Sequence, residues 1–418
     1  MGDNVDQLTR RRFLVATGVT AATALAGGAT AIGWHTLVQR AGTDPLPTGS
    51  KVLVLVTLYG GNDGLNTLVP VDDPAYHAAR PELAVAAQDA LPLGDGLGLN
   101  PGMTGLKKLW DDGRLAAVRG VSYPGPDRSH FRSMAIWQTA APESPTTTGW
   151  IGRWLDTAGA DPLLAVALDP VLPPALAGAT TAGAALPIAG LRLPPGTLGT
   201  GFRALGEPQE GEPALQARAA KAMRDVVRTA ELLGPATEAP ADPDDEDEER
   251  SNGASAGGRG ALAGQLDVVR RCIELGVPTR VYSVSLGGFD THANERGTQQ
   301  RLLGELDAAV AGFLDTIGRG PRGADVVVAV YSEFGRRVAA NASDGTDHGT
   351  AGPVFLAGAP VRGGFYGEQP SLTDLDDGDL KPTTDFRDIY ATLLAGVLGA
   401  DPGRILDGHD RRLPLLQP

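Results

Sequence analysis

The chain has 418 residues, of which 42% are hydrophobic, enough for one elaborated α/β domain or for two or three smaller domains. Its formal net charge is −14, and residues 238–250 alone carry eight acids and one arginine. The rest of the chain is only modestly acidic, which argues against nucleic acid as a partner because phosphate binding needs a basic face. The single cysteine, Cys272, excludes an internal disulfide and lies in an amphipathic pattern typical of a buried structural thiol.

The N-terminus has the pattern of an export signal. Thr-Arg-Arg-Arg-Phe-Leu at residues 9–14 precedes a moderately apolar segment that several glycines interrupt. A twin arginine before such a weakly hydrophobic stretch predicts a Tat-type signal over residues 1–37, read by the Tat export machinery. Residues 29–31 form a possible cleavage triplet, and retention of the segment as an anchor stays open. The protein is therefore expected outside the cytoplasm, in the periplasm, the cell wall or the medium, with no other membrane contact.

A linker over residues 38–50 is expected to lead into one α/β domain over residues 51–418. Short unbroken apolar runs predict strands that are buried on both faces of a mostly parallel sheet. Helical spacing of apolar residues predicts helices between them, so that helices cover both sides of the sheet. The expected strands are 52–58, 115–120, 281–286, 326–332 and 353–357, and the expected helices include 103–112, 130–137, 148–155, 214–233, 261–275, 299–317 and 388–398.

The stretch at residues 236–260 is rich in Pro, Gly, Ser and acids and has few apolar residues. This composition predicts a disordered loop, because too little apolar surface is available to pack. A solvated loop is the simplest interpretation, and a segment that binds a cation or a partner is the alternative.

Acidic and imidazole side chains follow the predicted strands. Asp63 comes after the first strand, Asp290 and His292 follow residues 281–286, and Glu333 ends residues 326–332. Strands of a parallel sheet end at one edge, where α/β proteins bind their ligands. Residues of this kind can share divalent cations. We therefore expect these four side chains, together with His348, to meet within about 10 Å, the span that two bridged cations roughly 4 Å apart would allow.

Each of these residues also has a plain structural interpretation. Asp63 could cap its own turn, and Asp-x-His at residues 290–292 is common by chance. Glu333 could pair with a following arginine, since an unpaired carboxylate at the end of a buried strand is costly. His348 could lie in a surface turn. Their repeated position at strand ends favours a shared polar site over these separate explanations.

Six short motifs give the chain a resemblance to a known family. They are residues 9–14, Gly-Gly-Asn-Asp-Gly-Leu-Asn at 60–66, Arg-Ser-His-Phe at 128–131, Gly-Phe-Asp-Thr-His at 288–292, Ser-Glu-Phe-Gly-Arg at 332–336 and Asp-His-Gly-Thr at 347–350. Together they resemble the bacterial DUF1501 proteins. That family is in turn distantly similar to the alkaline phosphatase and sulfatase superfamily, which implies an α/β/α sandwich with a two-metal site.

The resemblance implies roles for individual residues. Asp63, Asp290, His292, Glu333 and His348 would be metal ligands, and Ser129, at a predicted helix start, would be the nucleophile. A histidine of the superfamily pattern is replaced by Phe334, which is expected to point away from the site into the packing layer. This departure puts the second cation in doubt. The implied cofactor is one or two divalent cations, with Zn, Mn, Mg and Ca all open.

The implied mechanism uses the cation to lower the pKa of the Ser129 hydroxyl and to neutralise charge on a phosphoryl or sulfuryl oxygen. His130 would act as a general acid or orient the substrate. Arginines would clamp the remaining oxygens, the candidates being Arg128, Arg132, Arg336 and Arg337. The expected function is thus an exported hydrolase of small or polymeric phosphate or sulfate esters. The alternative is a non-catalytic binding module for a surface polymer or a protein partner.

The export signal gives the first testable prediction. Replacing Arg10 and Arg11 with Lys keeps the positive charge but removes the twin arginine, so the double variant should accumulate in the cytoplasm. Cell fractionation and immunoblotting measure this directly. Unchanged export of the variant would contradict a Tat-type signal.

Overall fold

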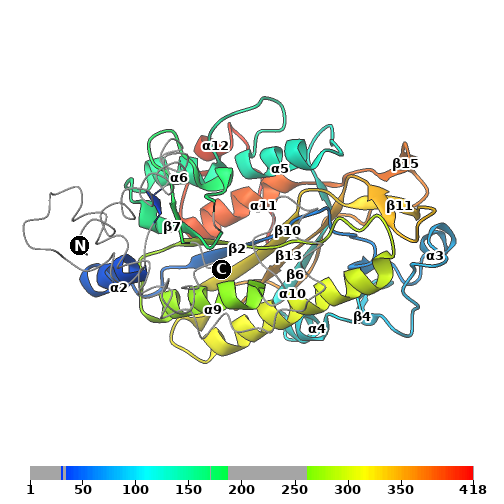
Figure 1. Cartoon of the computed structure of the whole chain (residues 1–418), viewed down its shortest axis with the longest axis horizontal. Helices are drawn as coiled ribbons and strands as arrows, with labels where there is room; N and C mark the ends of the chain where they lie inside the picture. The colour runs from blue at the N-terminus through cyan, green and yellow to red at the C-terminus, as the bar shows by residue number, and fades with distance from the viewer. Residues whose placement is uncertain (1–29, 32–33, 170, 187–260, 418) are drawn as a thin grey trace, which may run out of the picture.

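The structure is a computed structural model that describes residues 30–31, 34–169, 171–186 and 261–417. In this part of the chain a central sheet lies between two layers of helices, so the predicted three-layer α/β/α fold is confirmed (Figure 1). The export signal at 9–14, the expected helix at 214–233 and the acidic loop at 236–260 lie outside the described residues.

The central sheet has ten strands in the order β1-β8-β7-β9-β2-β10-β13-β6-β14, and β17 also pairs with β6. Its strands are β1 (Thr30–Ala31), β2 (Val52–Leu58), β6 (Leu115–Ser122), β7 (Ala165–Ala167), β8 (Ala184–Ala185), β9 (Val281–Leu286), β10 (Val326–Ser332), β13 (Gly352–Ala357), β14 (Gly364–Tyr366) and β17 (Thr384–Asp385). Smaller sheets are formed by β3 (Leu68–Val69), β4 (Leu91–Gly94) and β5 (Leu97–Leu99), by β11 (Arg336–Ala340) and β12 (Thr346–His348), and by β15 (Leu375–Asp376) and β16 (Asp379–Leu380).

The described α-helices are α2 (Trp34–Thr43), α3 (Pro74–Ala79), α4 (Thr104–Asp111), α5 (His130–Thr139), α6 (Trp150–Thr157), α9 (Ala261–Glu274), α10 (Glu295–Gly318), α11 (Phe386–Leu393) and α12 (Pro402–Ile405). Helices α4, α9 and α10 cover one side of the sheet, and α5, α6, α11 and α12 cover the other (Figure 1). A π-helical turn, Leu394–Leu398, continues α11.

Alternation along the central strands builds two cores. Val52, Val54 and Val56 of β2 pack in the core with α9 and α10, whereas Leu53 and Leu55 pack on the opposite face with α5, α6 and α11. All seven residues of β2 are buried. Successive strand side chains point to opposite faces, so a continuous apolar run is required where both faces are covered.

One strand of the described sheet runs against the others. β13 pairs antiparallel with both β10 and β6, whereas the other pairings in this sheet are parallel. The start of β13 therefore lies at the edge where β2, β6, β9 and β10 end, which we call the carboxyl edge. A segment that precedes β13 in the chain thus reaches the same edge as segments that follow the parallel strands.

Helix α2 occupies the first part of the expected linker at 38–50. Its Leu37 is fully buried in the core that α9 and α10 also form, and Leu46 beyond it is buried there too. The segment therefore packs against the domain. Among the residues that the structure describes, no helix is both long and apolar enough to span a membrane.

Gly60 provides a stability test, because the chain after β2 touches the chain after β9 there. Gly60 has a φ of +117°, and a Cβ added to it would lie 2.4 Å from the backbone nitrogen of Asp290. Gly113 is a matched control, with a φ of +68° and open space around its Cβ position.

We predict that Gly60→Ala lowers the free energy of unfolding by about 2–4 kcal/mol, because backbone strain and overpacking both contribute. Gly113→Ala should cost only about 1 kcal/mol, from the left-handed backbone alone. Urea denaturation measures both values. Equal losses in the two variants would contradict the close approach.

Candidate functional site

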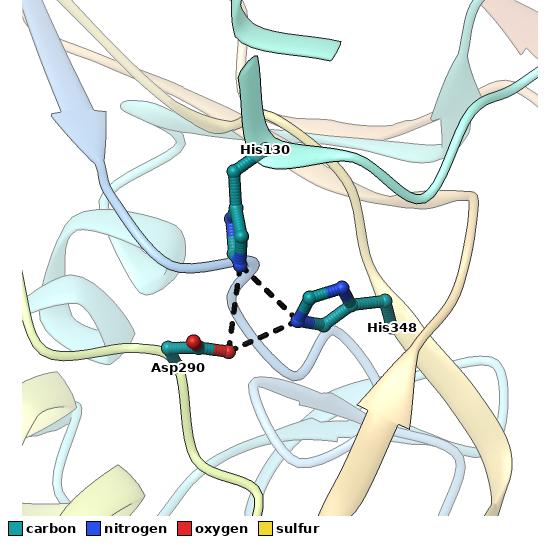
Figure 2. A group of neighbouring side chains, drawn as sticks. All are labelled: His130, Asp290 and His348. Carbon is teal, nitrogen blue, oxygen red and sulfur yellow. Dashed lines mark hydrogen bonds and ion pairs between the residues drawn. The ribbon is translucent and has the colours of Figure 1, made fainter. Parts of the chain in front are cut away.

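Two histidines and one aspartate bring their ligand atoms together at the carboxyl edge, and a third histidine, His292, lies beside them. Nε2 of His348 lies 3.1 Å from Nε2 of His130 and 2.9 Å from Nε2 of His292. Oδ1 of Asp290 lies 3.1 Å from the same His348 nitrogen. It also lies 3.0 Å from Nε2 of His292 and 3.5 Å from Nε2 of His130. Figure 2 shows His130, Asp290 and His348 meeting from three segments of the chain. The ligand atoms of these three residues all lie within 4.8 Å of one another.

The fold explains why these residues meet. His130 is the first residue of α5, which follows β6, and Asp290 and His292 follow β9. His348 ends β12 and precedes β13. Because β13 is antiparallel, its leading segment comes to the carboxyl edge with the others. In an all-parallel sheet, His348 would have been carried to the opposite edge.

Hydrogen bonds on the other ring nitrogens orient two of the imidazoles. His130 Nδ1 lies 2.9 Å from Oε1 of Glu333, and His348 Nδ1 lies 2.9 Å from the carbonyl oxygen of Arg128. These oxygens can only accept, so Nδ1 of each ring carries a proton and Nε2 is the nitrogen left to bind a cation. Nδ1 of His292 lies 3.6 Å from Asp347. His130 and His348 thus have the Nδ1 partners that metal-bound histidines usually have.

The spacing of these atoms fits a small tetrahedral cation. Zinc binds imidazole nitrogen and carboxylate oxygen at roughly 2.0–2.2 Å, so two ligands at the corners of a tetrahedron lie about 3.4 Å apart. The separations among His130, Asp290 and His348, from 3.1 to 3.5 Å, are close to this value. These three residues therefore form a donor set that suits zinc and leaves one coordination position open, with His292 beside the group.

Asp290 is held in its ionised form. Burial alone would raise the pKa of its carboxyl, but hydrogen bonds from His130, His348 and Arg336 hold this pKa well below its usual range. Conversely, a hydrogen bond to Asp290 and a smaller effect from the hydrogen bond to Glu333 raise the pKa of His130 to about 9. Burial and the nearby Arg336 lower the pKa of His292. A cation would thus replace a proton that His130 otherwise holds.

Arg336, expected to clamp substrate oxygens, is instead part of the framework. Its guanidinium is buried and donates to the carbonyl oxygens of Gly61, Thr346, Gly60 and Phe289. Nη2 also contacts Oδ1 of Asp290 at 2.7 Å. Its donors are therefore committed to the protein, and its charge stabilises the Asp290 carboxylate.

Glu333, expected as a metal ligand, contacts the ring of His130 on the side away from the other ligand atoms. Its side chain is 2% exposed, and its Oε1 accepts hydrogen bonds from the Gly60 N–H and from His130 Nδ1, both at 2.9 Å. The Ser332 hydroxyl donates to Oε2 at 3.0 Å. A carboxylate that orients a ligating histidine in this way raises the basicity of the ring. The sequence identified the residue, and the structure gives it a positioning role.

The structure does not bring Asp63 into the group. This fully buried carboxylate pairs with the equally buried Arg80, Oδ2 to Nη1, at 2.5 Å. Burial would raise the pKa of Asp63, but the Arg80 guanidinium holds it below its ordinary value. Burial and the charge of Asp63 also raise the pKa of nearby Glu295, which favours its protonated form. Asp63 already has a counter-charge, supplied by a residue that the sequence pattern does not mark.

Ser129 caps α5, as its sequence position predicts. Its Oγ accepts the backbone N–H of Arg132 at 3.5 Å, and the side chain is exposed. It is adjacent in the chain to His130, which the sequence pattern marked as an acid or an orienting residue and the structure places among the ligand atoms. The signal for that placement is the position of His130 just after a buried strand, β6.

The prediction that Phe334 points away from the site is wrong. Its ring centroid lies 4.8 Å from the ring centroids of both His130 and His348. A Cβ on Gly61 would meet the Phe334 ring at 2.1 Å, so this glycine leaves the space that the ring fills. Phe334 is thus an apolar support beneath two of the histidines.

The chain belongs to the DUF1501 family, described as a protein family of unknown function, whose model matches residues 172–416. No curated protein sequence matches the chain. Among solved structures, it is similar to a protein in the alkaline phosphatase superfamily from Vibrio parahaemolyticus, with 12% identity and a TM-score of 0.42 over 90% of this chain and 76% of that one.

Two further solved structures are similar. The lipoteichoic acid synthase LtaP from Listeria monocytogenes has 12% identity and a TM-score of 0.39, over 91% of this chain and 81% of that one. The C-terminal periplasmic domain of EcEptC from Escherichia coli, in complex with Zn, has 10% identity and a TM-score of 0.39, over 88% and 92%.

Proposed function

We propose that the chain is a metal-dependent hydrolase of phosphate or sulfate esters, with one zinc ion bound by His130, His348 and Asp290 and with His292 beside the open coordination position. The observation that carries the proposal is the convergence of two imidazole nitrogens and one carboxylate oxygen, with Nδ1 of each ring bonded to the protein on the far side. Imidazole-rich sets favour zinc over magnesium or calcium, which prefer oxygen ligands. Manganese is the second choice.

One cation is proposed because the other expected ligands already have partners. Glu333 is bonded to His130 and to Gly60, and Asp63 is paired with Arg80. Two neutral imidazoles and one carboxylate around a divalent cation leave a net positive centre. Such a centre attracts an anionic substrate, which supports a phosphate or sulfate ester over a neutral one.

When bound, the cation would act as a Lewis acid toward a phosphoryl or sulfuryl oxygen. The chain itself would supply the nucleophile, orientation and a fixed framework. The Ser129 oxygen would attack phosphorus or sulfur as its proton passes to solvent water. The ester oxygen would leave and take a proton from water to become an alcohol, and a second water would then release phosphate or sulfate and restore the serine hydroxyl. Free N–H groups at the start of α5 favour negative charge there. Glu333 and Phe334 would keep His130 in place.

Metal content tests the proposal directly. We predict that the zinc-loaded chain retains about one ion after dialysis, whereas His348→Ala and Asp290→Asn lose it because each removes a ligand. Glu333→Gln should weaken zinc binding about 10–100-fold, as replacement of a residue that hydrogen-bonds a metal ligand usually does. His77→Ala is the matched control, because His77, on α3, hydrogen-bonds the Val71 carbonyl away from the site, so the variant should bind zinc like wild type.

Elemental analysis gives the metal content, and hydrolysis of p-nitrophenyl phosphate and p-nitrophenyl sulfate gives the activity. Unchanged zinc binding in His348→Ala would contradict the site. Zinc binding by the wild type without turnover of any ester would instead favour the binding-module alternative.

Ser129 provides a separate test of the chemistry. Ser129→Ala should retain zinc but lose at least a hundredfold in kcat, because the attacking hydroxyl is gone. Loss of the helix cap should cost only about 1 kcal/mol of stability. Mass spectrometry of quenched wild-type reactions should detect a phosphorylated or sulfated Ser129. Full turnover by Ser129→Ala would show that water attacks instead.

A further inference from the structure

We propose that Arg128 and Arg337 form an anion-binding subsite beside the histidine group, and that Asp377 occupies this subsite until an anionic group of the substrate displaces it. The word substrate here rests on the proposed ester hydrolase. The subsite itself is argued from the charges and contacts of a short hairpin at the rim of the site.

Two arginines from distant segments direct their guanidinium groups at one oxygen. Nη2 of Arg128 lies 3.1 Å from Oδ2 of Asp377, and Nη2 of Arg337 lies 3.3 Å from the same atom. The arginine side chains are 39% and 32% exposed, and that of Asp377 is 81% exposed. Asp377 Oδ2 therefore marks a solvent-accessible point where an anionic oxygen is held between two positive charges.

A second carboxylate, buried behind Asp377, fixes Arg128. Asp379 is 4% exposed, and its Oδ2 accepts from Arg128 through Nε at 2.8 Å and Nη2 at 2.6 Å. Its Oδ1 lies 3.7 Å from Nε of Arg337, within ion-pair distance. The buried Asp379 thus orients the Arg128 guanidinium by two hydrogen bonds and attracts that of Arg337 by its charge. Without Asp377, the remaining three groups would carry a net charge of +1 with two donors facing outward.

The hairpin displays Asp377 at its tip. β15 and β16 pair antiparallel through Asp376 and Asp379, so the turn has only two residues, Asp377 and Gly378, with φ values of 50° and 85°. These values define a tight turn that Asp-Gly favours. The base of the hairpin is fixed, since the Thr350 hydroxyl donates to the Leu380 carbonyl at 2.5 Å. Only the tip carboxylate is free to turn away.

The subsite is joined to the histidine group through the backbone. The carbonyl of Arg128 accepts the Nδ1–H of His348, and Arg128 precedes His130 by two residues. Arg337 follows Arg336, whose guanidinium contacts Asp290. A substrate with a second anionic group, as in a phosphate- or sulfate-bearing polymer, could then contact both places. Exposed ion pairs are weak in water, so displacing Asp377 costs little, whereas a tetrahedral oxyanion offers each arginine a stronger bond.

The test measures anion binding to protein stripped of metal with a chelator, so that neither zinc nor turnover contributes. Sulfate and inorganic phosphate are titrated separately by calorimetry at constant ionic strength. Asp377→Asn removes the competing carboxylate, and asparagine tolerates the left-handed turn. We predict binding about two- to fivefold tighter than wild type, the affinity change that corresponds to loss of an exposed ion pair.

Two controls keep the result specific. Asp315→Asn removes a carboxylate that pairs with Arg319 on the exposed face of α10, and it should leave anion binding unchanged. Adding Arg337→Gln to Asp377→Asn should abolish the gain. Thermal denaturation checks that each variant is folded.

Unchanged affinity in Asp377→Asn, or a gain that survives Arg337→Gln, would overturn the proposal. A gain for phosphate alone or sulfate alone would support it and identify the oxyanion. Because the protein carries no metal, these outcomes are independent of whether His348→Ala loses zinc, so the subsite and the hydrolase can fail separately.

Discussion

The site depends on one buried cation, the guanidinium of Arg336. It donates to the carbonyls of Gly60 and Gly61 after β2, to that of Phe289 after β9 and to that of Thr346 before β13. It also contacts the Asp290 carboxylate. One planar group with fixed donors thus ties three loops together and sets the distance between Asp290 and His348. Lysine could not do this, because a single ammonium has three donors at one point.

The acids at the carboxyl edge differ in their counter-charges, and this difference assigns their roles. Asp63 has Arg80, the raised pKa of Glu295 favours its protonated form, and Glu333 accepts from His130. Asp290 alone among them faces several imidazole Nε2 atoms. Buried charges are costly unless they are paired, so the partner of each carboxylate indicates what else it can bind. Among these four, Asp290 is the acid suited to a cation.

The sequence predicted the sheet, because unbroken apolar strands are local signals, and it marked several of the polar residues that meet at the carboxyl edge. Asp290, His292 and His348 do meet as expected. The contacts of Asp63 and Arg336, by contrast, depend on partners that are distant in sequence. Arg80 lies 17 residues from Asp63 and carries no pattern that marks it. The predicted direction of the Phe334 side chain was wrong, because the alternation of a strand does not determine which way a side chain points after the strand has ended. The antiparallel direction of β13 was also not evident from a short apolar run.

The central claim is that imidazole nitrogens and one carboxylate oxygen hold a zinc ion. X-ray absorption at the zinc edge of the loaded protein tests it most directly, because scattering from imidazole rings is distinctive. The account predicts about four nitrogen or oxygen ligands at roughly 2.0–2.1 Å with the multiple-scattering pattern of several imidazoles, and a weaker pattern in His348→Ala. A spectrum of zinc surrounded by oxygen alone, identical in the two proteins, would contradict it.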